Sequence, residues 1–210
     1  DQNEGFGENL LSGKDVNTRK DQAARSKLYW EASDATTVTL AGDYSRSEGT
    51  AGISTRPLPG TTSVIGQVGW PYDFYDIQPD LEPEMDIEAW GGSATIEHVM
   101  GDYTVTSITA YRDLKQNQTF DLDMTPVPLL LPDLHEFNDQ FTQEFQFAYD
   151  SDSINWMVGL FYMDATNEYD PFTITGMALD PSFAVNPLLA NPAFGTSHQA
   201  EQDTKSYAAF

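Results

Sequence analysis

The strongest constraint on this chain is a repeated alternation of apolar and polar residues in paired segments. Residues 24–32 show it first, with Leu28 and Trp30 at even positions and the charged Arg25 and Lys27 at odd positions. Successive side chains of a β-strand point to opposite faces of its sheet, so this period of two predicts a strand with one apolar and one polar face.

Six such segments are arranged as three predicted hairpins, and a seventh segment follows them. The hairpins comprise residues 24–32 with 36–46, 88–99 with 103–113, and 141–149 with 154–162, and the seventh strand begins near Gln202 and is still running at Phe210. Each hairpin is closed by about three turn-forming residues, at 33–35, 100–102 and 151–153. The sequence therefore predicts an all-β, antiparallel chain of about seven hairpin-connected strands.

The segments between the hairpins are long and irregular. They cover about 47–87, 114–139 and 165–200 and are rich in Pro, Asp, Asn and Gly. Structureless loops of this length are uncommon in compact soluble domains. Short turns that alternate with long loops are typical of outer-membrane β-barrels, where turns face the periplasm and loops face outward.

Aromatic residues lie near strand ends or on the apolar face. They include Trp30, Tyr44, Trp90, Tyr103, Tyr111, Phe141, Tyr149, Trp156 and Tyr162. Such residues form belts at membrane–water boundaries, which favours a transmembrane barrel. The same residues would also suit the core of a soluble β-sandwich, so this alternative stays open.

Composition excludes several functional classes. The chain has 33 acidic and 10 basic residues, a net charge of −23, and no cysteine. This charge argues against binding to nucleic acid or to an anionic leaflet, since both need clustered Lys and Arg. The acidic residues form either a solvated surface or loops that meet cations. Without cysteine, disulfides, thiolate metal sites and Cys nucleophiles are excluded.

An odd number of strands, with the last unfinished, suggests that residues 1–210 are one part of a longer polypeptide. Bacterial single-chain barrels have even strand numbers, and an unpaired strand edge is not tolerated in lipid. We therefore expect these residues to form a partial barrel domain rather than a closed barrel.

Several strings resemble the barrel of TonB-dependent outer-membrane receptors. They are residues 25–34, 38–45, 103–112, 143–147, 155–162 and 205–210. The resemblance implies a 22-stranded barrel in the bacterial outer membrane, plugged by an N-terminal domain, that imports a scarce nutrient such as a siderophore–iron chelate. It also implies that the inner-membrane TonB complex acts through the plug. Neither the plug nor a TonB-contacting segment is recognised within these residues.

Two groups of residues are candidates for ligand contact. Arg25, Lys27 and Arg112 fall on the polar face, which in a barrel lines the lumen. They would contact a plug or an anionic ligand, or serve as ordinary lumen charges. The loop aromatics Trp70, Tyr72, Phe74 and Tyr75 would grip a ligand or pack the loop on itself.

No catalytic or metal-binding constellation has convincing spacing, so neither an enzyme nor a cofactor is predicted. His98, His135 and His198 are isolated in sequence. Asp121 and Asp123, and the acidic residues of 82–86, supply hard oxygen ligands of the kind Ca²⁺ takes, but they do not match an EF-hand loop. The preferred interpretation of these acidic segments is a solvated loop.

The predicted function is a transport receptor that moves its substrate without making or breaking bonds. Its expected partners are the lipid bilayer, a small-molecule nutrient such as a metal chelate, and the TonB complex through the plug alone. Two alternatives stay open: a soluble secreted β-sandwich with acidic binding loops, and a passive porin.

Overall fold

The computed structural model describes residues 2–58, 60–63, 65–66 and 73–210. Its long strands are β4 (Arg19–Ser33), β5 (Thr36–Gly49), β6 (Glu84–Met100), β7 (Tyr103–Thr119), β8 (Leu131–Asp150), β9 (Asn155–Thr175) and β10 (Gly195–Ala209). Three two-residue strands, β1 (Gln2–Asn3), β2 (Glu8–Asn9) and β3 (Lys14–Asp15), precede them, and three 3₁₀ turns, η1 (Met177–Leu179), η2 (Pro181–Ala184) and η3 (Pro187–Leu189), lie between β9 and β10.

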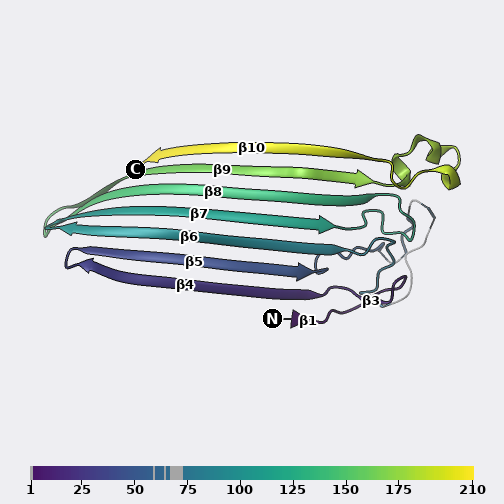
Figure 1. Ribbon diagram of the computed structural model, residues 1–210, viewed down its shortest axis with the longest axis horizontal. Helices are drawn as coiled ribbons and strands as arrows, with labels where there is room; N and C mark the ends of the chain where they lie inside the picture. Colours follow the sequence, from purple (N-terminus) through teal and green to yellow (C-terminus); the bar gives the residue numbers. More distant parts are fainter. Residues whose placement is uncertain (1, 59, 64, 67–72) are drawn as a thin grey trace.

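The long strands form one antiparallel sheet in sequence order. Each strand pairs with the next along the chain, from β4 to β10, and β1 adds a short pairing at the β4 edge (Figure 1). The predicted all-β, antiparallel, hairpin-connected fold is therefore confirmed. No helix among the described residues is long and apolar enough to cross a membrane.

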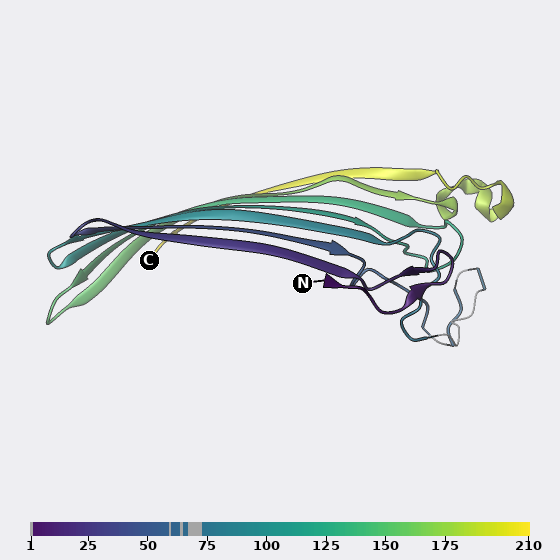
Figure 2. The same cartoon turned by 60° about the horizontal axis from the view of Figure 1, so that its bottom comes forward.

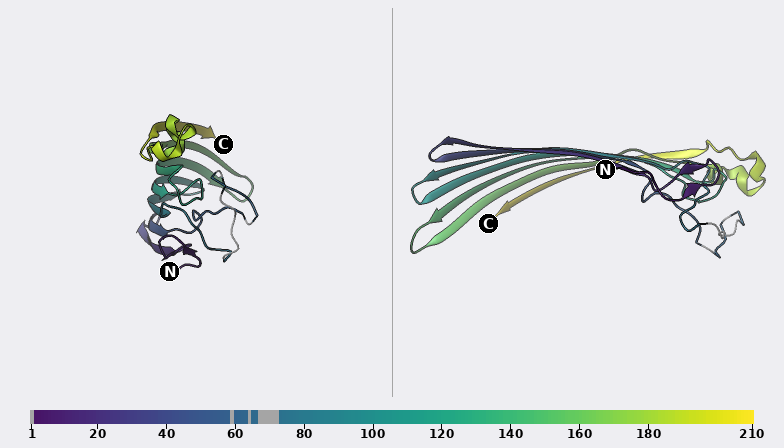
Figure 3. Two further views of the ribbon diagram at one scale, coloured as in Figure 1. Left: turned by 90° about the vertical axis from the view of Figure 1, so that its right-hand side faces the viewer. Right: turned by 90° about the horizontal axis from the view of Figure 1, so that it is seen from below.

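The sheet is twisted and curved, and its two ends differ. The strands are joined by short turns at one end, whereas the long loops and the three 3₁₀ turns gather at the other (Figure 2). Apart from the small β2–β3 pair, the described residues form no second sheet that could pack against the large one. Seen from two further directions, the long strands remain a single layer (Figure 3). A β-sandwich needs two packed sheets, and this chain does not supply them within the described ranges.

Strand register confirms the predicted faces. Leu28 lies opposite Leu40, which lies opposite Ala94, so the apolar positions of three strands share one face. Tyr149 lies opposite Trp156 in the same way. The intervening residues, including Arg25 opposite Asp43, form the polar face.

The strands are longer than predicted, and nearly all of the added length lies at the loop end. The three long loops shrink to residues 50–83, 120–130 and 176–194, against the predicted 47–87, 114–139 and 165–200. In the added segments both faces carry polar side chains, so the apolar–polar period disappears although backbone pairing continues. Pro132 and Pro171 also lie inside strands, where proline usually argues against a strand.

Aromatic side chains on the apolar face form two belts. The turn-side belt contains Trp30, Tyr103, Tyr149 and Trp156, and the loop-side belt contains Tyr44, Trp90, Tyr111, Phe141, Tyr162 and Tyr207. Neighbouring rings touch, with centroids 4.8 Å apart for Tyr103 and Tyr149 and 5.1 Å apart for Tyr162 and Tyr207. Between the belts lies an apolar band made of Leu28, Val38, Leu40, Ala94, Ile96, Val105, Phe145, Phe147, Val158 and Leu160.

The loop-side belt crosses the sheet obliquely. Trp90 pairs with Asp113 on β7, and Tyr111 lies two residues closer to the turn end than Asp113. In the same way, Phe141 pairs with Asp164 on β9, and Tyr162 lies two residues closer to the turn end than Asp164. The belt therefore shifts by two residues, about 6.6 Å along the strands, for each two strands, about 9.6 Å across the sheet. This shift corresponds to a tilt of about 35°. Transmembrane barrels have strand tilts of about 35–45°, so a level belt is what this stagger would give in a barrel.

The separation of the belts fits a membrane. Tyr111 lies eight positions after Tyr103 on β7. This spans about 27 Å along the strand, or about 22 Å after allowing for the tilt, close to the roughly 25 Å apolar band of outer-membrane barrels.

The loop end holds the small buried core of the described chain. Val16, Ile77 and Leu129 are almost completely buried, together with the polar Asn9 and Thr125. The amide of Asn9 donates hydrogen bonds to the Pro79 carbonyl and the Glu82 carboxylate. This core joins the N-terminal segment to loops 50–83 and 120–130. It contains no residue of the apolar band, whose side chains remain uncovered by protein.

Asp121 lies in this core, which corrects the expectation of a solvated acidic loop at this position. Its side chain is 2% exposed, and Oδ1 accepts hydrogen bonds from the backbone N–H groups of Asp123 and Met124. Oδ2 is buried and has no hydrogen-bond partner within the described ranges. Burial, together with the negative charges of Asp123 and Asp80, raises the pKa of Asp121 to about 7.

We predict that Asp121 makes this core more stable at acidic pH. Because the pKa of the folded carboxyl is raised above its usual 3.8, the folded core keeps a proton that the unfolded chain releases, and stability falls as the pH rises towards about 7. Asp121→Asn keeps the Oδ1 acceptor and should weaken this dependence, to which nearby Asp80 also contributes because burial raises its pKa. The measurement is hydrogen-exchange protection of the Asp123 and Met124 amides between about pH 5 and pH 7.5, corrected for intrinsic exchange.

Asp180→Asn is the matched control. Hydrogen bonds from the backbone N–H groups of Asn191 and Ser182 lower the pKa of Asp180, so its contribution to stability is lost only as the pH falls below the usual carboxyl range. That variant should leave the dependence between about pH 5 and pH 7.5 unchanged. Equal pH dependence in wild type and Asp121→Asn would contradict the prediction.

Candidate functional site

The polar face carries an ion pair that spans three strands. Arg112 on β7 places Nη2 2.9 Å from Oδ1 of Asp43 on β5, across the intervening strand β6. Arg25 on β4 lies directly opposite Asp43, and all three residues line a hollow of about 260 Å³. Two of the predicted lumen cations are therefore brought together around one carboxylate.

Gly91 makes this arrangement possible. It is the residue of β6 that lies between Asp43 and Arg112 in the register. A Cβ at this position would lie 3.0 Å from Cγ of Arg112 and 3.1 Å from the Tyr111 carbonyl oxygen. The missing side chain thus leaves the space in which the arginine extends towards Asp43. The sequence showed two adjacent glycines but not this role, because the role depends on the cross-strand register.

Lys27 lies on the same face, two residues further along β4 and opposite Ala41. It does not line the hollow of Arg25 and Arg112.

The predicted aromatic loop patch is described only in part. Trp70 and Tyr72 lie outside the described residues. The Phe74 and Tyr75 rings meet edge to face, and the Tyr75 ring also contacts Phe6 at 4.6 Å between centroids. Both side chains keep large exposed surfaces, 65% for Phe74 and 48% for Tyr75. The described pair therefore packs within the loops and also presents surface to the exterior.

The loop end also contains an apolar groove that the sequence analysis did not identify. The groove has a volume of about 560 Å³ and lies between loops 50–83, 120–130 and 176–194. Its apolar lining includes Leu58, Leu122, Met124, Leu130, Ala178 and Phe183, and Arg56 supplies a positive charge. The lining comes from three segments that are far apart in the sequence, so no local pattern could have revealed it.

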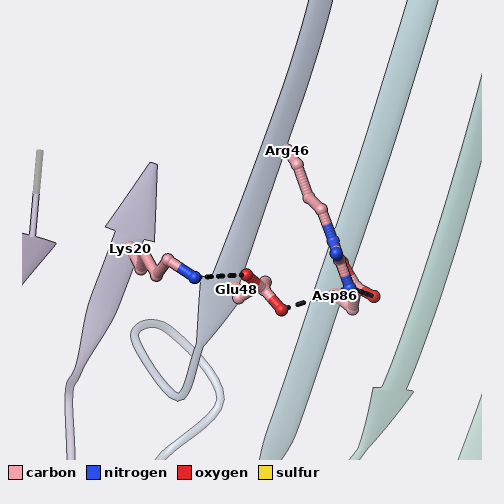
Figure 4. A network of polar contacts seen from close by, with 4 residues as sticks. All are labelled: Lys20, Arg46, Glu48 and Asp86. Carbon is pink, nitrogen blue, oxygen red and sulfur yellow. Dashed lines mark hydrogen bonds and ion pairs between the residues drawn. The ribbon is translucent and has the colours of Figure 1, made fainter. Parts of the chain in front are cut away.

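Beyond the loop-side belt, the formerly apolar face becomes charged. Lys20 pairs with Glu48 at 3.2 Å, and Arg46 bridges Glu48 at 3.1 Å and Asp86 at 2.8 Å, which links β4, β5 and β6 (Figure 4). These side chains are 33–51% exposed, so solvent screens each pair and its contribution to stability is small. At the level of this network, the side chains on the sheet face change from apolar to charged.

The histidines make local contacts. His98 Nδ1 lies 2.8 Å from Thr36 Oγ1, His135 Nδ1 lies 2.7 Å from Asn117 Oδ1, and His198 Nε2 lies 3.0 Å from Thr196 Oγ1. Within the part of the chain that the structure describes, no group of three or more His, Asp or Glu residues is placed to hold a metal ion.

Comparison with known proteins gives a likeness in fold. The chain is similar to the crystal structure of the ferric yersiniabactin uptake receptor FyuA from Yersinia pestis, with a TM-score of 0.60 and 14% sequence identity. The similarity covers 100% of this chain and 38% of the FyuA chain, so the present residues match a little over a third of that receptor. No family model matches the chain, and no curated protein matches it in sequence. At this identity the likeness supports the fold of a receptor barrel and leaves the ligand open.

We predict that Gly91→Val separates Arg112 from Asp43. The added side chain occupies the path of the arginine, and the loss of an exposed pair of this kind changes a local equilibrium by up to about fivefold. The measurement is the rate at which phenylglyoxal modifies Arg112, followed by mass spectrometry, and the expected result is a faster reaction in the variant.

Gly92→Val is the control, because Gly92 points to the other face and a Cβ there meets only the Ala41 carbonyl oxygen at 3.7 Å. Equal rates for the Gly91 and Gly92 variants would show that Gly91 does not position Arg112.

Proposed function

We propose that this chain is part of the barrel of an outer-membrane receptor that imports a scarce, bulky nutrient. The observation that carries the proposal is the apolar band between two aromatic belts, uncovered by protein on one face of a tilted sheet. The likeness in fold to FyuA agrees with it. Transport in this scheme involves no covalent step.

The uncovered band argues against a soluble binding module. Its exposed side chains include Leu28 (59%), Leu160 (62%) and Phe145 (51%), within one continuous face. Soluble proteins rarely expose apolar patches of this extent. In a bilayer the same face would contact acyl chains, and the belts would lie at the two boundaries.

The finer proposal is that transport is TonB-dependent and that the ligand is a metal chelate such as a ferric siderophore. Its support is the resemblance in sequence to TonB-dependent receptors, and the fact that the structural neighbour is described as a ferric yersiniabactin uptake receptor. The TonB complex would act through a plug domain in the same polypeptide.

Cell fractionation tests the location. An antibody against residues 73–87 should detect a detergent-dependent band in the outer membrane of the source cells. A band in the soluble fraction would overturn the proposal in favour of a secreted binding module.

Uptake measurements test the mechanism. Cells that lack the gene should lose uptake of a ferric chelate at nanomolar concentration, and cells that lack TonB should show the same loss. Uptake that persists without TonB would contradict the receptor mechanism and support a passive porin.

We predict that a charge on the apolar face is costly and that the same charge on the polar face is not. Leu40 lies within the apolar band on β5, and Thr39 is its neighbour on the polar face. Leu40→Arg should lower the free energy of unfolding by about 2–4 kcal/mol, because arginine would face acyl chains. Thr39→Arg, the matched control, should change it by less than about 1 kcal/mol.

The measurement is equilibrium urea unfolding of the full polypeptide in phospholipid vesicles. Equal losses in the two variants would contradict the assignment of the two faces.

A further inference from the structure

The groove at the loop end combines an apolar lining with a cation, Arg56, that forms no ion pair with the described residues. Arg56 is half-buried and holds its guanidinium 4.1 Å from the centroid of the Phe74 ring. Its Nη2 atom is buried and has no hydrogen-bond partner among the residues that the structure describes. Buried polar groups are almost always hydrogen-bonded, and a guanidinium has donors only, so this site lacks an acceptor.

Asp123, the carboxylate that also lines the groove, already has partners. Its Oδ1 accepts hydrogen bonds from the N–H and hydroxyl of Thr125, and its Oδ2 accepts one from the Leu130 N–H. These bonds hold loop 120–130 in its turn. Asp123 is therefore committed to the loop backbone, whereas the Arg56 guanidinium remains available.

The rest of the groove is suited to an apolar body. Leu58 is 67% exposed and Leu122 is 46% exposed, and both border the groove with Met124, Leu130 and Phe183. A volume of about 560 Å³ is within the range of small-molecule sites. Filling it with an aliphatic or aromatic group would remove these side chains from water.

We infer that this groove binds an amphipathic organic anion, with its carboxylate on Arg56 and its apolar body along the leucine-lined wall. The inference rests on the proposed function, because it names the class of ligand that the outer loops of the proposed receptor would bind. The net charge of −23 does not prevent such binding, since charges further than about 8–10 Å away are largely screened at physiological ionic strength. The cation–π contact with Phe74 restrains the Arg56 guanidinium before the ligand arrives.

The test uses the full polypeptide in lipid nanodiscs, without detergent, and a dansyl-labelled undecanoate as the probe. Its uncharged primary amide is the matched ligand, and empty nanodiscs give the background from partition into lipid. Wild type should bind the carboxylate about tenfold more tightly than the amide, because a hydrogen-bonded charge pair adds this much or more.

Arg56→Gln should raise the Kd of the carboxylate about tenfold and leave that of the amide unchanged. Leu58→Glu, at an exposed position, should weaken binding of both probes. Lys14→Gln, which removes a cation that lines a different hollow, is the control and should change neither Kd.

Equal binding of the carboxylate by wild type and Arg56→Gln would overturn the inference, as would a wild-type signal no greater than that of empty nanodiscs. Either result in a protein that fractionates with the outer membrane would reject the groove and leave the receptor function standing. A soluble protein would instead reject the receptor function.

Discussion

The structure depends on one constraint: the backbone N–H and C=O groups of the long strands bond to each other across the sheet. In the bilayer that we propose as its surroundings, lipid would offer these groups no other partners. The long strands meet this requirement by pairing in sequence order through a single sheet, from β4 to β10. With the backbone satisfied between strands, the side chains are free to match two different surroundings. One face carries the apolar band and its belts, and the other carries the ion pair of Arg112 and Asp43.

The tilt of the strands connects the belts to the register. In a tilted barrel, aromatic residues at one membrane level would lie at shifted positions on successive strands. The two-residue steps from Trp90 to Tyr111 and from Phe141 to Tyr162 are shifts of this kind. Above the loop-side belt the same face carries the exposed network of Lys20, Glu48, Arg46 and Asp86. The strands therefore extend beyond the apolar layer, and the small buried core forms only where the loops meet.

The period of two predicted the strands well wherever one face is apolar, as in residues 24–32 and 103–113, because a strand with one apolar and one polar face has that pattern. It failed beyond the loop-side belt, where both faces are polar and only the backbone pairing defines the strand. The period of two also could not predict contacts between side chains on different strands or loops. Gly91 makes room for Arg112, Asp121 is buried, and Arg56 lines a groove, all because segments distant in sequence meet in the fold. The aromatic residues that could be recognised in the sequence, Phe74 and Tyr75, turned out to pack partly on each other.

We propose that the odd residues of a strand such as β7 face lipid and that the even residues face water. Since the chain has no cysteine, single cysteines can be placed at each position from 103 to 111 and spin-labelled in the full polypeptide in vesicles. Labels at odd positions, such as Val105 and Thr109, should collide mainly with oxygen dissolved in lipid. Labels at even positions, such as Thr104 and Thr106, should collide mainly with a water-soluble nickel chelate. Accessibility without this period, or with the two faces exchanged, would contradict it.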